Sequence, residues 1–248
     1  MTKGITKGFK AYFEAYEIIS RLKLWKYFAI PMILSFIIFL LIGGLSYVFS
    51  DNIGNYIASF WAWEFGKETF ETISTVFGGL LVLTLGFIAF KHIILALSAP
   101  FMGPISKKIE DDFIGGKGEA ITSSSSALLI RGIRISIRNL VRELILTIPI
   151  LLIGLIPVIG IFTTVLLFLM QAYFAGFGNM DYTLERHFSY KDSVLFVKRN
   201  RGLATGNGIV FMLFLLIPFI GVILVLPFSV TAATIETVKL IQQEKKNN

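Results

Sequence analysis

Long apolar stretches separated by shorter polar segments form the main pattern along this chain. Residues 28–49 carry no charged side chain, and further apolar blocks occupy residues 73–99, 144–178 and 209–235. A helix over 28–49 would be about 33 Å long, enough to cross a bilayer core of about 30 Å. In a soluble domain the apolar residues recur at core spacing and not in long blocks. The pattern therefore predicts an all-α integral membrane protein.

Composition supports this class and narrows the chemistry. The 248 residues are 55% hydrophobic and 16% charged, whereas soluble domains carry about 25% charged residues. There is no cysteine, which excludes disulfides, thiolate metal sites and cysteine nucleophiles, and with only His92 and His187 a histidine-built metal site is not expected. No Ser-x-x-Lys, zinc or phosphate-loop motif is present. We expect no cofactor, no metal and no enzymatic activity.

The N-terminal residues 1–27 mix lysines with apolar side chains at helical spacing, notably Phe9, Phe13 and Tyr16. This pattern predicts an amphipathic helix. Two alternatives remain for its aromatic stripe, which lies on the membrane surface or packs on other helices. The first membrane span follows, with Pro31 expected in its first turn, where proline costs little.

Proline and glycine mark the expected helix breaks. The sequence Leu-Ile-Pro-Val-Ile-Gly at 155–160 returns as Leu-Ile-Pro-Phe-Ile-Gly at 216–221, so Pro157 with Gly160 and Pro218 with Gly221 are predicted hairpin tips. The segment around Pro100 is expected to break or kink the second block. Gly202, Gly206 and Gly208 are interpreted as a flexible turn before the last block.

The distribution of charge predicts the topology. Of the 23 Lys and Arg residues, only Lys67 lies in segment 50–72, which also holds Asp51 and three glutamates. The positive-inside rule places this segment outside and the other polar segments, with both termini, in the cytoplasm. Blocks 144–178 and 209–235 must then begin and end on one side, although two full spans need about 40 residues. Half-penetrating hairpins fit better, whereas a single span over 209–235 would place the basic C-terminus outside.

These observations define the predicted fold. The chain is a single domain, 1–248, of two full transmembrane helices plus two half-penetrating helical hairpins and amphipathic surface helices. Irregular backbone at a hairpin tip cannot face lipid and must be buried in protein or line water. This requirement favours packing between subunits, so we expect a homo-oligomer.

Ionisable residues in or beside the apolar blocks are candidate functional groups. Lys91 and His92 interrupt the second block; such residues are usually functional, although Lys91 could snorkel to the surface. Arg131, Arg134, Arg138 and Arg142 share one helical face, which lines an anion vestibule or rests on anionic lipid.

The polar segment after residue 178 holds Asp181, Glu185 and His187. The two acids are expected to pair with Arg186 and Lys191. The sharper alternative is proton coupling through His187.

Lys23 and Lys26 precede the first span. With the free N–H groups of the helix they could hold an oxyanion. The alternative is that they anchor the helix to phospholipid headgroups.

Several short motifs occur in an order that resembles one known family. They are Gly8-Phe9, Leu24 with Pro31, Ala99-Pro100-Phe101 followed by Glu110, Ile156-Pro157-x-Ile-Gly160, Asp181-Tyr182 with Glu185 and His187, Ile217-Pro218 with Pro227, and Ala232-Ala233-Thr234. Over nearly its whole length the chain resembles the CysZ sulfate permeases and the related etoposide-induced-protein family.

The resemblance implies a permease of the bacterial inner membrane that admits sulfate for cysteine synthesis. It also implies two full spans, two half-penetrating hairpins and an oligomer. Some members are thought to insert in both orientations, but the charge bias of this chain argues against that.

The chain departs from the family at the proposed sulfate site. The family motif Gly-Leu-Arg-Arg reads Lys23-Leu24-Trp25-Lys26 here. Lysine is a point charge and cannot make the bidentate fork of arginine. In the Asp-Tyr motif the family proline is Thr183 and the asparagine is Arg186.

Two functional hypotheses follow. The first is a permease or channel for sulfate or a similar small oxyanion, in which Lys23, Leu24, Trp25 and Lys26 bind substrate and the hairpins form a pathway between subunits. The second is a non-transporting membrane protein that organises lipid or partner proteins through the arginine face. With a net charge of +7 beside apolar blocks, we expect membrane lipid and small anions as partners, and no nucleic acid.

Overall fold

The fold consists of helices throughout the part of the chain that the structure describes. This computed structural model describes residues 2–59, 67–116, 118, 120–154, 159–217 and 219–247, in which there is no strand. The helices are α1 (Thr2–Arg21), α2 (Trp25–Ala58), α3 (Lys67–Ile114), α4 (Ser125–Gly154), α5 (Ile159–His187), α6 (Tyr190–Arg199), α7 (Arg201–Leu215) and α8 (Ile220–Asn247). The predicted all-α class is confirmed.

Four of these helical segments are long and apolar enough to cross a membrane. They are Trp25–Phe49, Ile88–Ile114, Ile161–His187 and Ile220–Lys246, while Arg201–Leu215 is a shorter apolar helix. Length and composition therefore identify a multi-pass membrane protein.

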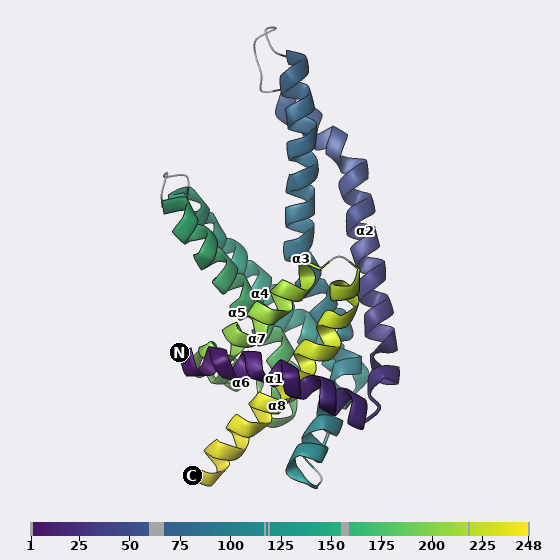
Figure 1. Ribbon diagram of the computed structural model, residues 1–248, viewed down its shortest axis with the longest axis vertical. Coiled ribbons are helices and arrows are strands. Elements are labelled where there is room, and N and C mark those ends of the chain that lie inside the picture. The colour runs from purple at the N-terminus through teal and green to yellow at the C-terminus, as the bar shows by residue number, and fades with distance from the viewer. Residues whose placement is uncertain are drawn as a thin grey trace.

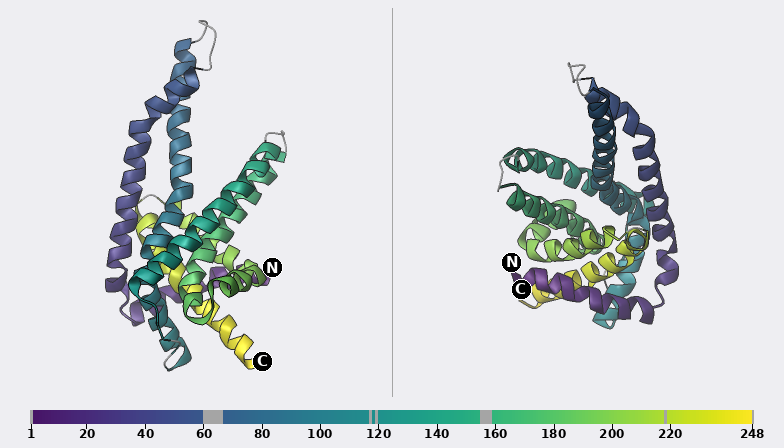
Figure 2. Two further views of the ribbon diagram at one scale, coloured as in Figure 1. Left: turned by 180° about the vertical axis from the view of Figure 1, so that it is seen from behind. Right: turned by 45° about the horizontal axis from the view of Figure 1, so that its top comes forward.

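The helices form pairs that rise from a common base (Figure 1). α2 and α3 make the longest pair, and their joined ends lie farthest from the two chain termini (Figures 1 and 2). α4 and α5 make a shorter pair that diverges from α2 and α3, and α7 and α8 turn back at a lower level still. α1 lies across the base of these pairs.

The two repeated motifs occupy corresponding places in the last two pairs. Gly160 and Gly221 are the second residues of α5 and α8, each just after the connection between two paired helices. α7 and α8 are therefore separate helices, which excludes one straight helix over 209–235. A Cβ atom on Gly221 would lie 1.8 Å from the carbonyl oxygen of Phe214, so glycine lets the two helices approach. Pro157 and Pro218 lie outside the described residues.

At Pro100 the structure shows the expected kink and not a break, whereas Pro31 differs from the prediction. α3 continues through Pro100 and Pro104 to Ile114, so the helix is not ended there, although Figure 1 shows its lower part tilted from its upper part. Neighbouring helices stabilise a helix that lacks a hydrogen bond at proline, and Met102 of this segment is fully buried. Pro31 is not in the first turn, because α2 begins six residues earlier, at Trp25.

The glycines expected in a flexible turn lie inside α7 and are buried. A Cβ atom on Gly206 would lie 2.5 Å from the carbonyl oxygen of Ile5 in α1, and one on Gly208 would lie 1.7 Å from that of Ala172 in α5. Small residues let membrane helices pack closely. These glycines therefore serve helix packing, and the predicted turn was wrong.

The structure shows where the aromatic stripe of α1 points, for which the sequence left two alternatives. Its buried face carries Ala11, Tyr12 and Ala15, and the Tyr12 hydroxyl donates a hydrogen bond to the carbonyl oxygen of Asn207 in α7 (2.8 Å). Burial raises the pKa of this hydroxyl. Phe13 and Tyr16 are 81% and 59% exposed. The helix packs on its neighbours with another face, and its aromatic stripe points outward.

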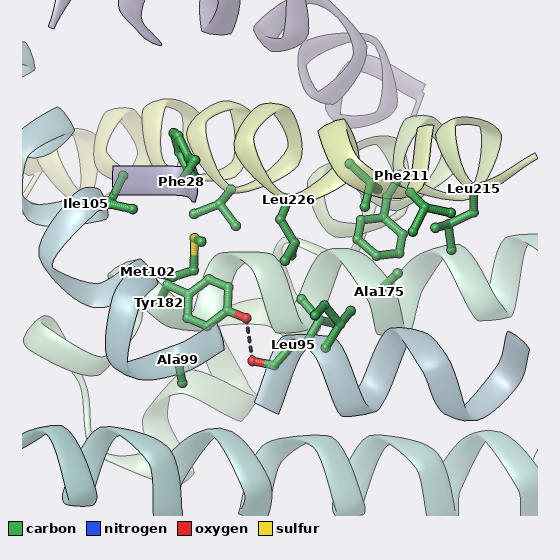
Figure 3. Packing of buried hydrophobic residues seen from close by; sticks show 14 of the residues in the cluster. Phe28, Leu95, Ala99, Met102, Ile105, Ala175, Tyr182, Phe211, Leu215 and Leu226 are labelled. Carbon is green, nitrogen blue, oxygen red and sulfur yellow. Dashed lines mark hydrogen bonds between the residues drawn. The ribbon is translucent and has the colours of Figure 1, made fainter. Parts of the chain in front are cut away.

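The largest apolar cluster joins six helices, α1, α2, α3, α5, α7 and α8. Phe28 of α2, Leu95 and Met102 of α3, Tyr182 of α5 and Leu226 of α8 all belong to it (Figure 3). The Tyr182 hydroxyl donates to the carbonyl oxygen of Leu95 within this core. The core fixes the base of α2 relative to the other helices, and the candidate anion-binding residues lie at that base.

Candidate functional site

The turn between α1 and α2 holds the four residues predicted to bind substrate. Lys23 has a positive φ of 51°. Its N–H donates to the carbonyl oxygen of Ser20 (3.2 Å), and the N–H of Leu24 donates to that of Ile19 (2.9 Å). This is the Schellman ending of a helix, in which the left-handed residue is usually glycine. The backbone thus explains why the family motif has glycine where this chain has Lys23.

The four motif residues divide into an outer and an inner pair. Lys23 and Lys26 are exposed, whereas Leu24 is fully buried. The Trp25 ring packs edge-on against Phe228, with ring centroids 6.0 Å apart. Only the two lysines are therefore placed to meet an ion from solution.

A third cation lies beside this pair. Lys108 of α3 sits over the Tyr27 ring at 3.7 Å from the centroid, and Lys26 approaches the same ring at 5.1 Å. α2 begins at Trp25, and the N–H groups of Tyr27 and Phe28 donate to the carbonyl oxygen of Leu24 (2.8 and 3.3 Å). The N–H groups of Trp25 and Lys26 have no backbone acceptor among the described residues. Cations around a helix N-terminus attract anions. The geometry forms a basic, exposed surface at the start of a membrane helix.

Lys91 and His92 form a buried ionic cluster with Glu143 of α4. Lys91 Nζ donates to Glu143 Oε1 at 2.6 Å, and His92 Nε2 lies 2.9 Å from Glu143 Oε2. The Lys91 and Glu143 side chains are 0% exposed. Lys91 does not snorkel to the surface, because its counterion lies inside the protein.

Arg131 and Asp181 join α4 to α5. Arg131 donates to both carboxylate oxygens of Asp181 at 2.9 and 3.1 Å, and also to Ser193 Oγ (2.7 Å) and to the carbonyl oxygen of Phe188 (3.1 Å). Burial works to lower the pKa of Arg131, but the paired carboxylate outweighs it and raises that pKa. These contacts give Arg131 a structural role.

Arg186 pairs with Glu110 of α3 and not with Asp181 or Glu185. Its guanidinium donates to Glu110 Oε2 at 2.8 and 3.2 Å, and His187 Nε2 lies 2.8 Å from Glu110 Oε1. The expected pairing within the 181–191 segment was therefore wrong. The true partners come from other helices, 50 residues or more away.

Glu185 stands apart from these pairs. Its buried Oε1 has no hydrogen-bond partner among the residues that the structure describes. Beside it a cavity of about 10 Å³, lined by Ala99, Gly132, Asp181 and Glu185 among others, leaves room for one water molecule. The ionic centre of the subunit is closely packed.

The arginines of the predicted face have different surroundings. Arg134 lies over the Tyr190 ring at 4.2 Å, and Arg138 lies over the Phe177 ring at 5.0 Å. Arg142 is exposed. The part of the face that begins at Arg138 remains available to a partner.

Comparison with known proteins identifies the family. The model of the sulfate transporter CysZ/etoposide-induced protein 2.4 family matches residues 11–226. The chain belongs to this family. A sulfate transporter CysZ of Pseudomonas aeruginosa is 26% identical over 230 residues, which cover 90% of each chain. Another from Pseudomonas fluorescens is 29% identical over 157 residues, which cover 60% of this chain and 61% of that relative.

The packed centre contains four ionisable residues that the sequence analysis singled out. Glu110, Asp181, Arg186 and His187 contribute to the packed centre where α3, α4 and α5 join. Sequence reasoning missed Glu143, although it is the sole acidic residue between 120 and 180. Within the described ranges, no group of three or more His, Asp or Glu side chains is placed to hold a metal ion.

Proposed function

We propose that this chain is a permease or channel for sulfate or a similar small oxyanion in the bacterial inner membrane, and that it supplies sulfur for cysteine synthesis. The full-length similarity to CysZ sulfate transporters supports this function. The observation that carries it is the exposed pair Lys23 and Lys26 at the start of α2. These lysines would capture the anion from the cytoplasmic face or release it there.

The proposed membrane orientation follows charge and helix length. α2 and α3 cross the bilayer fully, and the pairs α4–α5 and α7–α8 enter part way from the cytoplasmic side, where both termini lie. The greater reach of α2 and α3 in Figure 1 supports this difference in depth. The basic residues of the other polar segments support the assignment of sides.

We place the anion pathway between subunits. The cavity at the ionic centre is far too small for sulfate. Large apolar side chains are exposed beside the connections of the two shorter hairpins, at Phe162 (72%) in α5, Leu216 (72%) just after α7 and Ile220 (65%) in α8. Because irregular backbone within a bilayer needs protein or water around it, further copies of the chain would cover these tips. The active form is then a homo-oligomer.

From the replacement of the motif arginine by Lys26 we predict how the oxyanion is bound. An ammonium group attracts an oxyanion as a point charge and imposes little orientation. The free N–H groups at the start of α2 add directional donors. This site would favour anions by charge and size more than by shape.

Equilibrium binding of radiolabelled sulfate to the purified protein in detergent tests this site. Lys26→Gln should weaken binding by about 10- to 150-fold, since one lost charge-assisted contact is worth roughly 1.5–3 kcal/mol. Lys26→Arg should retain binding, and Lys246→Gln, which removes an exposed charge near the C-terminus, is the matched control. Equal binding by wild type and Lys26→Gln would remove Lys26 from the site.

A second candidate function is the organisation of lipid or partner proteins without transport. It is favoured by Trp25, which occupies an arginine position of the family motif and packs its ring on Phe228. The site thus lacks the arginine fork of its relatives. A folded, oligomeric protein that neither binds nor moves sulfate would favour this candidate.

A further inference from the structure

A groove between α4 and α6 gathers three cations. Arg138 and Arg142 of α4 and Lys191 of α6 line it together with Tyr190, Val194 and Leu195, and its volume is about 380 Å³. Arg142 and Lys191 are exposed, while Arg138 is half-buried. The groove is distant in sequence from Lys23 and Lys26 and shares no residue with their surface.

The three cations have no carboxylate to neutralise them. None forms an ion pair in the part of the chain that the structure describes, unlike Arg131, which lies two turns before Arg138 on α4. The nearby Asp192 carboxylate accepts a hydrogen bond from Ser189 Oγ (2.6 Å) at the start of α6. Burial, and then repulsion by Arg142, lower the pKa of Arg138. An anion in the groove would relieve this repulsion.

Apolar side chains continue from the groove along α4. Val141 and Ile145 follow Arg138 and Arg142 by three residues each, so they lie one turn nearer the α4–α5 tip. They are 48% and 62% exposed, and Leu195 at the groove is 54% exposed. Figure 2 shows α4 rising from the base, where α6 lies, toward its tip. Charge near the base and apolar surface above it match the order of headgroup and acyl chain in a lipid.

Further cations extend this surface along α6. A neighbouring hollow of about 640 Å³ shares Leu195 with the groove and is otherwise lined by Lys198, Arg199 and Arg201. Basic pockets beside membrane helices on the cytoplasmic side are typical sites for anionic headgroups.

We propose that the groove binds the phosphate of an anionic phospholipid, with its acyl chains along Val141 and Ile145. Arg142 and Lys191 contact the phosphate, and Arg138, held on Phe177, supplies charge from below. Free sulfate is also an oxyanion, but it has no acyl chain to cover the exposed face of α4. The site stands independently of the proposed transport activity.

Native mass spectrometry of the detergent-solubilised protein with phosphatidylglycerol tests the site. The double variant Arg142→Gln/Lys191→Gln should bind phosphatidylglycerol about tenfold more weakly than wild type, because each cation near an anionic headgroup contributes to binding. Phosphatidylcholine should bind weakly to both proteins. The variant Lys10→Gln/Lys246→Gln removes the same charge from other exposed positions and should behave as wild type.

A competition arm separates lipid from free anion. Millimolar sodium sulfate, compared with sodium chloride at equal ionic strength, should leave bound phosphatidylglycerol in place. Displacement by sulfate would overturn the lipid assignment and make the groove an inorganic-anion site. Undiminished phosphatidylglycerol binding by the folded double variant would show that the groove is not the lipid-binding site. If the double variant does not fold, the single variants Arg142→Gln and Lys191→Gln should each show a smaller loss, and no loss in either would contradict the proposal.

Discussion

At the scale of residues, Lys23 shows how backbone geometry constrains a binding motif. In the described ranges, Lys23 and Phe219 are the two non-glycine residues with positive φ. The left-handed region costs a side chain with a Cβ atom about 1–2 kcal/mol. Lys23 therefore adds a cation to the α1–α2 turn at the expense of stability. The sequence revealed the substitution of glycine, but the physical reason needed the backbone.

Replacement of this residue separates its charge from its conformation. Lys23→Gly should raise the free energy of unfolding by about 1 kcal/mol, because glycine adopts positive φ without strain. Lys23→Ala removes the same charge but keeps a Cβ atom, so it should give no such gain. Thermal unfolding in detergent measures both, and equal melting temperatures for the two variants would contradict this account of the turn.

The cluster of Lys91, His92 and Glu143 marks the limit of residue-level prediction. Lys91 and His92 were recognisable because they interrupt an apolar block. Their partner lies 52 residues beyond Lys91, on another helix. No local pattern encodes that distance, so snorkelling was an equally valid expectation from the sequence.

Removal of the buried carboxylate should be costly. Glu143→Ala leaves the Lys91 ammonium without its counterion and should destabilise the protein by about 3–5 kcal/mol. The double variant Lys91→Met/Glu143→Leu removes both charges and should recover most of this loss. Chemical unfolding in detergent compares the variants; a mild effect of Glu143→Ala alone would show that the ion pair is not buried as described.

At the scale of elements, proline alone did not predict where helices end. In each copy of the repeated Pro-x-Ile-Gly motif the second helix of a pair begins inside the motif, α5 at Ile159 and α8 at Ile220. The same Pro-x-x-Gly spacing occurs at Pro100 and Gly103, yet α3 continues past it because Ala99 and Met102 are buried against neighbours. The glycines in α7 were wrongly interpreted as a turn, because their role is close contact with α1 and α5. At Pro100 and in α7, tertiary packing therefore determines where the helix continues.

Glycine at the start of α8 should be required for the α7–α8 pair. Gly221→Ala places a Cβ atom against the carbonyl oxygen of Phe214, and such overpacking should cost about 1–3 kcal/mol. Gly44→Ala in α2 meets no atom within 4 Å and should be neutral or stabilise by up to about 1 kcal/mol. Thermal unfolding of the two variants tests this prediction. Similar melting temperatures would mean that α7 and α8 do not approach closely.

At the scale of the whole molecule, the membrane class and the family could be predicted from the sequence, whereas membrane depth and assembly depend on contacts outside one chain. Charge counting assigns sides without any structural information. α2 and α3 reach farther from the base than the pairs α4–α5 and α7–α8 do (Figure 1), which is the arrangement that the proposed topology requires.

The absence of native cysteine allows a clean test of topology. Ser59→Cys, at the end of α2, should react with a membrane-impermeant maleimide in intact bacterial cells from outside. Ser124→Cys, just before α4, should react only after the inner membrane is permeabilised. Equal labelling of both positions in sealed cells would contradict a single orientation and would instead fit insertion in both directions.

Uptake of radiolabelled sulfate into sealed liposomes that contain the purified protein measures whether the chain transports a small oxyanion. We expect saturable uptake above protein-free liposomes, competed by excess unlabelled sulfate and reduced by Lys26→Gln but not by Lys246→Gln. Uptake no greater than in protein-free liposomes, with folded protein in sealed vesicles, would contradict the claim.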